Sequence, residues 1–101
     1  MTKLEKEIER RLVNIVKGLG GKCLKWVCPG WQGVPDRIIL LPGGRAIFVE
    51  LKRPKGGVVA PMQTWWRDTL ERMDFTVWHI YDDHDLNKAA LILHQILEEK
   101  R

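Results

Sequence analysis

Three charged residues stand within or beside apolar runs that have the character of buried strands. Asp36 precedes the run IILL, and Glu50 and Lys52 lie in the run AIFVELK. Charged side chains are rarely buried without a partner, so their placement needs a chemical reason. Two carboxylates can share a hard divalent cation such as Mg²⁺, and a lysine can orient a water or stabilise charge on a phosphate. The set therefore favours metal-assisted hydrolysis of a phosphodiester.

The spacing predicts that the three side chains converge. Side chains alternate along a strand, so Glu50 and Lys52 share one face. The tripeptide PGG between the two apolar runs predicts a tight turn and hence a hairpin. Pairing outward from that turn brings Asp36 close to residues 50–52, at the end remote from the turn. The alternative is a structural ion pair at the end of the sheet. A pair of that kind needs only one acid and one lysine, so we favour the metal site for two acids and a lysine in apolar strands.

A four-stranded sheet with helices on both faces is predicted to position these residues. Apolar residues at helical spacing predict a first helix, which Gly20 and Gly21 end. Pro61 suits the first position of a second helix, and Asp85 can cap the last. The predicted helices cover residues 2–19, 61–73 and 85–100, and the predicted strands cover 22–27, 36–41, 45–52 and 75–81. The order indicates a single α/β domain over residues 1–101.

Composition limits the class of protein. The chain has 101 residues, of which 45% are hydrophobic, and this supports one modest core. No run approaches the length of a membrane span, and the charged N-terminus is unlike a signal peptide, so we expect a cytoplasmic protein. Cys23 and Cys28 are too few for a disulfide framework and lack a second zinc-binding pair, so we expect reduced thiols. The net charge of +4 leans only weakly toward a polyanionic partner.

The motifs also carry a family resemblance. The dipeptide PD at 35–36, followed by ELK at 50–52, resembles the signature of the PD-(D/E)xK nuclease superfamily. The longer segment GGKCLKWVCPGWQGVPDRIILLPGGRAIFVELKRPKGG, with a downstream glutamine, resembles the VRR-NUC family, which includes small stand-alone phage and bacterial nucleases. The resemblance implies a PD-(D/E)xK core of order αβββαβ around a central four-stranded mixed sheet. A C-terminal helix is added to that core here.

The resemblance assigns roles to the charged residues. Asp36 and Glu50, with the backbone carbonyl of Leu51, would bind Mg²⁺ or Mn²⁺. Lys52 would position the nucleophile. Gln63 matches the downstream glutamine of the family and would lie near the metal. Its alternative role is to satisfy backbone donors at the start of a helix.

A glutamate of the first helix also belongs to the family's site. Glu5 falls in the middle of the apolar arc of the predicted helix, and Glu9 falls at its edge. We favour Glu5 and place Glu9 second. The competing role for Glu5 is a capping box with Thr2.

Basic and aromatic residues near these motifs are candidate DNA contacts. The candidates are Lys25, Trp31, Arg37, Arg53 and Lys55. The alternative for the basic segment at 53–55 is an ordinary solvated loop. The chain has five tryptophans. We expect Trp26 and Trp78 in the core, and we expect that adjacent Trp65 and Trp66 cannot both face it.

Taken with the resemblance, the residues predict a Mg²⁺- or Mn²⁺-dependent DNA endonuclease of a bacterial or phage-infected cell. The leading expectation is a homodimer acting on branched DNA such as a four-way (Holliday) junction. The dimer interface would use one of the aromatic patches, at Trp31 or at Trp65 and Trp66, with the last helix as a candidate addition. One alternative is a flap, nick or restriction-type nuclease. Another is a non-catalytic DNA-binding module.

Overall fold

The computed structural model of the chain describes residues 3–52 and 60–99. Their elements follow the predicted order, and each boundary lies within about two residues of its predicted place. The elements are α1 (Lys3–Gly18), β1 (Lys22–Lys25), β2 (Arg37–Leu41), β3 (Arg45–Leu51), α2 (Pro61–Arg72), β4 (Thr76–Ile80) and α3 (Asp83–Glu99). Within these ranges, every helix is too short or too polar to cross a lipid bilayer.

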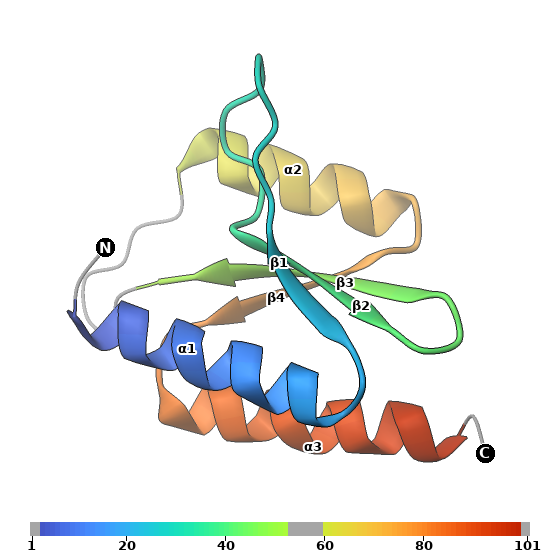
Figure 1. Cartoon of the computed structure of the whole chain (residues 1–101). Coiled ribbons are helices and arrows are strands. Elements are labelled where there is room, and N and C mark those ends of the chain that lie inside the picture. The colour runs from blue at the N-terminus through green and yellow to red at the C-terminus, as the bar shows by residue number, and fades with distance from the viewer. Residues whose placement is uncertain (1–2, 53–59, 100–101) are drawn as a thin grey trace.

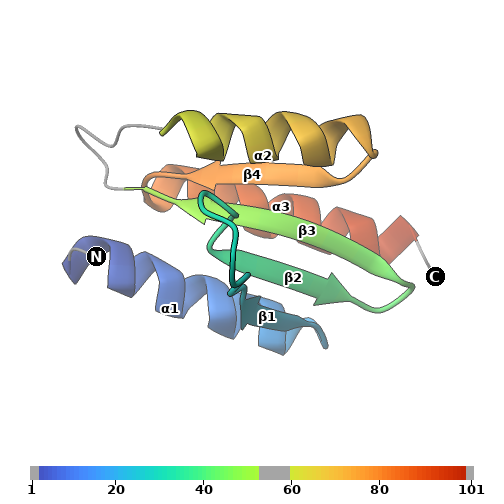
Figure 2. The ribbon, with the colours of Figure 1, turned by 90° about the horizontal axis from the view of Figure 1, so that it is seen from above.

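The four strands form one mixed sheet. Their spatial order is β1-β2-β3-β4; the first two pairs are antiparallel, and β3 and β4 are parallel. Helix α2 covers one face of the sheet, and α1 and α3 cover the other (Figures 1 and 2). The predicted α/β class and the mixed four-stranded sheet are therefore confirmed.

The main core lies between the sheet and the α1/α3 layer. Helix α1 contributes Ile8, Leu12 and Val16, which follow one another at intervals of one helical turn and are each at most 2% exposed. They pack with alternate residues of the central strands, such as Ile39 and Val49, both fully buried. Burying a side chain of this size contributes about 1.5–3 kcal/mol. This layer therefore anchors the hairpin that carries the charged residues.

The glycine stop of α1 has the predicted form. Gly20 adopts a φ of 83°, which favours glycine, and the N–H of Gly21 donates to the carbonyl of Val16 at 3.0 Å. A Cβ at Gly21 would stand 2.6 Å from the Leu40 carbonyl oxygen. The two glycines therefore end the helix and let the chain enter β1 in close contact with β2.

The start of α3 differs from its prediction. The helix begins at Asp83, and the capping carboxylate is that of Asp82, whose Oδ1 accepts from the N–H of Asp85 at 2.9 Å. Asp85 instead reaches back, and its Oδ2 accepts from the N–H of Tyr81 at 3.0 Å. The prediction that Asp85 caps the helix is wrong because α3 begins two residues earlier, at Asp83, so that Asp82 stands in the capping position and Asp85 lies within the first turn.

Both cysteines are free thiols, as predicted. Burial raises the pKa of Cys23 to about 11, and the nearby Arg37 opposes that rise. The Cys23 thiol therefore stays protonated and serves as a small apolar core residue.

Candidate active site

The β2–β3 hairpin brings Asp36 and Glu50 together. Arg37 pairs with Val49, so Asp36, one residue before β2, comes level with Glu50. Its Oδ2 accepts a hydrogen bond from the N–H of Leu51 at 2.8 Å. This is the convergence that pairing outward from the PGG turn predicts.

Glu50 is a buried acid in an otherwise apolar strand. It is 3% exposed, and no other polar residue in the described ranges is buried as completely. Its Oε1 accepts from Gln63 Nε2 at 3.0 Å and lies 3.7 Å from Lys52 Nζ. Its pKa is raised from 4.5 to about 8, chiefly because burial penalises the charged form and secondly because the Asp36 carboxyl lies beside it; Lys52 opposes the rise. The acid is thus held where its charge is costly unless a cation neutralises it.

Gln63 connects the acid, the lysine and the start of α2. Its Oε1 accepts from Lys52 Nζ at 2.5 Å and from the N–H of Ala60 at 3.0 Å, while its Nε2 donates to Glu50. Ala60 is the N-cap residue of α2 and has no side-chain oxygen to cap the helix. Gln63 therefore satisfies a backbone donor at the start of α2 and also contacts Lys52 and Glu50; its predicted place near a metal stays a proposal.

The donor set fits a hard divalent cation. Mg²⁺ commonly takes one or two carboxylates and completes its shell with water and substrate phosphate oxygens. Asp36 and Glu50 supply two carboxylates, whereas the amide oxygen of Gln63 is occupied by Lys52 and the Ala60 N–H. The described part of the chain holds no cluster of three or more His, Cys, Asp or Glu side chains suited to a metal. Carboxylate oxygens are hard donors of the kind that Mg²⁺ and Mn²⁺ take, whereas zinc sites commonly include nitrogen or sulfur donors.

Arg37 and Glu9 lie on the opposite face of the sheet from the carboxylates. Arg37 Nε and Glu9 Oε2 are 3.0 Å apart, and Arg37 Nη1 donates to the Cys23 carbonyl at 3.1 Å. The two side chains are only 17% and 13% exposed. Successive strand residues point to opposite faces, so Arg37 faces α1 while Asp36 faces α2. Arg37 therefore ties α1 to the sheet, which leaves it little surface to offer a phosphate.

The register moves Lys25 away from the site as well. Lys25 pairs directly with Arg37 and so shares its face. The expectation that Lys25 approaches the carboxylates is corrected on this ground. Arg53 and Lys55 lie outside the described residues.

Of the two helix glutamates, Glu5 lies nearer the end of α1 that adjoins the site. Glu9 pairs with Arg37 on the α1 side of the sheet. Glu5 lies in the first turn of α1 and is half-buried. The N-terminal end of α1 lies beside the carboxyl end of β3 in both views of the fold (Figures 1 and 2). The preference for Glu5 over Glu9 therefore stands as a proposal.

His79 is a neighbour of the site that the sequence does not reveal. It pairs with Glu50 across the parallel strands β3 and β4, and so faces α2 beside the carboxylate. Its Nε2 is buried without a hydrogen-bond partner among the described residues. Burial lowers the pKa of His79, and the cations Arg67 and Lys52 lower it further, so the ring is held neutral. Only the strand pairing could have shown this, because β3 and β4 are separated in sequence by α2.

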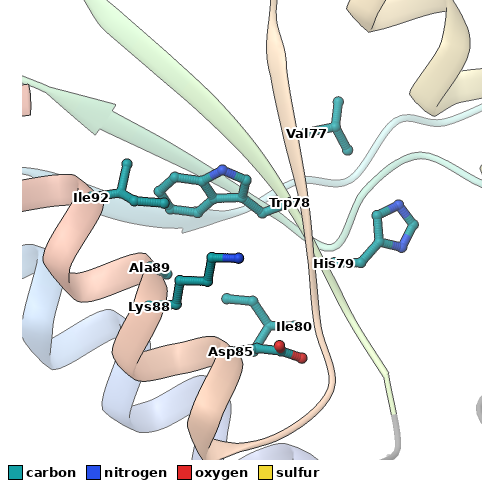
Figure 3. Close-up of a pocket in the computed structure, with 8 residues that line it drawn as sticks. All are labelled: Val77, Trp78, His79, Ile80, Asp85, Lys88, Ala89 and Ile92. Carbon is teal, nitrogen blue, oxygen red and sulfur yellow. The ribbon is translucent and has the colours of Figure 1, made fainter.

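A cavity of about 290 Å³ lies elsewhere, between β4 and α3. Figure 3 shows Trp78 on the α3 side of β4, whereas His79 points to the other side. The cavity is lined by Val77, Trp78, His79, Ile80, Asp85, Lys88, Ala89 and Ile92. None of Asp36, Glu50, Lys52 and Gln63 lines it, so it is separate from the charged cluster.

Sequence comparison relates this chain to a phage protein. No protein-family model matches the sequence. The chain is 52% identical over 50 residues to a protein of Acyrthosiphon pisum secondary endosymbiont phage 1 described as "Putative nuclease p44". That alignment covers 50% of this chain and 54% of the phage protein, so the chain matches about half the length of its relative.

Similarity to a solved structure extends over most of the chain. A structure described as "VRR_NUC domain" superposes with a TM-score of 0.80 at 23% sequence identity, covering 86% of this chain and 94% of that one. The chain therefore has the fold of a VRR_NUC domain, and the family resemblance predicted from its sequence is confirmed at the level of the fold.

Proposed function

We propose that the chain is a DNA endonuclease that depends on Mg²⁺ or Mn²⁺. The observation that carries this proposal is the convergence of Asp36, Glu50, Lys52 and Gln63 at one end of the β2–β3 hairpin. The VRR_NUC fold and the similarity to a phage protein described as a nuclease support it. We further propose that the chain acts in the cytoplasm of a bacterial or phage-infected cell.

Each residue of the cluster has a proposed task. Asp36 and Glu50 hold the divalent cation, with the Leu51 carbonyl as a further ligand, and when bound this cation acts as a Lewis acid on the phosphate. Lys52 orients the attacking water and stabilises the charge that develops on the phosphate oxygens. Gln63 fixes the positions of the Lys52 ammonium and the Glu50 carboxyl relative to each other through one hydrogen bond to each. Glu5 is proposed as a further contributor from α1.

The reaction is hydrolysis of a phosphodiester. The water oxygen forms a bond to phosphorus, and the bond from phosphorus to the 3′ oxygen of the preceding sugar breaks. The leaving 3′ oxygen gains a proton, and the water loses one to solvent. The products are a 5′-phosphate and a 3′-hydroxyl, which sets the end groups to look for.

An assay of divalent-metal-dependent nicking tests the function. Supercoiled plasmid and a labelled four-way junction are incubated with the protein in Mg²⁺, in Mn²⁺ and in chelator. Cleavage of the junction in preference to the plasmid supports a structure-selective nuclease, whereas equal cleavage favours a nicking or restriction-type enzyme. Binding without cleavage in either metal would favour the non-catalytic module.

Branched DNA is the substrate that we propose, and it implies a homodimer. One site of this kind cuts one strand, whereas resolving a four-way junction requires two symmetric cuts. Helix α3, one of the candidate interface elements, carries Leu91 with 66% of its surface exposed. An interface there would leave the α2 side of each copy open to DNA.

We expect light scattering to give the purified protein twice the mass of one chain at micromolar concentration. The reason is that a single small domain cannot reach both cleavage points of a junction. A clean monomer mass, both alone and with a junction bound, would end the junction-resolving proposal. Flap or nick cleavage would then take its place.

A further inference from the structure

Two tryptophans form a parallel stack on the α2 side of the molecule. Trp31, in the loop between β1 and β2, and Trp65, on α2, have ring centroids 6.0 Å apart and an interplanar angle of 7°. Trp31 is 55% exposed and Trp65 44%. We call this pair the aromatic platform. Large apolar rings left this open by the fold are candidates for contact with a ligand.

The loop that carries Trp31 packs against α2 and is hydrogen-bonded to it. Trp66 stands edge-on to both rings of the platform, and its Nε1 donates to the Gln32 carbonyl at 3.0 Å. Gly33 has a φ of 81°, and a Cβ there would come within 2.6 Å of Met62. This close approach to the first turn of α2 requires glycine. The platform is therefore built before any ligand arrives.

The platform and the charged cluster are connected through shared elements of the fold. The loop of Trp31 runs directly into Asp36, and Trp65 follows Gln63 by two residues on α2. Trp66 meets Trp26, which in turn packs on Phe48 of β3, two residues before Glu50. Trp26 is thus part of this aromatic layer on the α2 face and only half-buried, which corrects its expected place in the main core.

We propose that the aromatic platform stacks an unpaired nucleobase beside the scissile phosphate. Aromatic side chains stack on bases with about 1–3 kcal/mol per base, whatever the base, because every base has a flat π face. Bases inside an intact duplex are covered by their neighbours, so the ligand must carry an unpaired or splayed nucleotide. The proposal rests on the proposed nuclease function and specifies its substrate class: DNA that is single-stranded or opened at a branch.

The test compares DNA binding by variants of the full chain in chelator, where no cleavage occurs. Labelled single-stranded DNA and duplex of the same length are titrated with wild type, Trp31→Ala and Trp65→Ala, and binding is followed by fluorescence anisotropy. We expect each variant to bind single strands about tenfold or more weakly and the duplex within about twofold of wild type. Trp31→Phe should retain most of the single-strand affinity, because the ring is kept.

Met73→Ala is the matched control. Met73 is 55% exposed at the far end of α2 and belongs to no ring contact of the platform, so its loss should leave both affinities unchanged. A circular dichroism melt of each variant shows whether the fold is retained. If Trp31→Ala does not fold, Trp65→Ala and Trp31→Phe decide the question.

Two results would overturn the proposal. One is an equal effect on single strands and duplex, or no effect, in folded platform variants. The other is conversion of a dimer to a monomer by Trp31→Ala, which would make the platform an interface between copies. Failure of the nuclease function is distinguishable: wild type would then cleave nothing in Mg²⁺ or Mn²⁺, while the single-strand preference measured in chelator would persist.

Discussion

Glu50→Gln is expected to abolish cleavage and, at the same time, to stabilise the metal-free protein. The carboxylate is 3% exposed and beside Asp36, so its charge opposes folding when no cation is present. A glutamine keeps an oxygen that can accept from Gln63 but removes the charge and hence the metal ligand. We expect no cleavage above the chelator blank and a gain of about 1–3 kcal/mol in the free energy of unfolding near neutral pH.

The stability gain should depend on pH in a defined direction. The folded pKa of Glu50 is raised from 4.5 to about 8, so the wild type loses stability relative to the variant as pH rises through that window. Below about pH 4.5 the difference in the free energy of unfolding between wild type and variant should disappear, because Glu50 is then protonated in both the folded and the unfolded state. Glu98→Gln, an exposed acid on α3, is the control and should change neither property. If Glu50→Gln were less stable than wild type in chelator, this result would contradict the claim that the buried Glu50 charge opposes folding.

Lys52→Ala is expected to lower the cleavage rate by about 10²–10⁴-fold without weakening metal binding. Its Nζ contacts Gln63 and stands 3.7 Å from Glu50, so its removal takes a positive charge from the site and leaves both carboxylates in place. The rate is measured on single-turnover cleavage, and metal affinity is measured by calorimetric titration of Mn²⁺. Metal affinity should be equal or higher, because a competing cation is gone.

Lys88→Ala provides the matched control for Lys52→Ala. Lys88 is an exposed lysine on α3 beside the separate cavity of Figure 3. Its replacement should leave rate and metal affinity unchanged. Loss of Mn²⁺ binding in Lys52→Ala would show that the lysine supports the metal and does not act on the nucleophile or phosphate.

Local patterns were sufficient to predict the frame of the site. Alternation along β3 places Glu50 and Lys52 on one face, and the PGG turn fixes the hairpin register that brings Asp36 to them. The end of α1 at Gly20 follows from backbone conformation, which is a local property. These features depend on neighbours in sequence, so the sequence alone could predict them.

Contacts between distant segments were not predictable in the same way. The pairing of Arg37 with Glu9 depends on how α1 packs across the sheet, and either residue read alone suggests a different role. His79 comes to Glu50 through a parallel pairing that the sequence does not encode locally. Trp31 and Trp65 stack because Gly33 lets the loop approach α2. In each case the tertiary arrangement, and not the residue type, determines the function that we infer.

The aromatic platform and the charged cluster on the α2 face have different proposed functions. The platform would select an opened strand, and the carboxylate pair with Lys52 would cleave the phosphodiester next to it. Gln63 and Trp65 lie on the same helix, so the start of α2 positions both parts at once. A change that shifts this helix turn should therefore affect binding and cleavage together.

Cleavage by Asp36→Asn is the most direct test of the proposed site. The asparagine keeps an oxygen to accept from the Leu51 N–H, which is bonded at 2.8 Å in the wild type, so the hairpin end should be preserved. The variant and wild type are compared on the same labelled four-way junction in Mg²⁺, with binding measured in parallel in chelator. We predict that Asp36→Asn binds the junction as wild type does and produces no cleavage above the chelator blank. Cleavage by a folded Asp36→Asn at the wild-type rate in Mg²⁺ would contradict the assignment of the carboxylate pair as the active site.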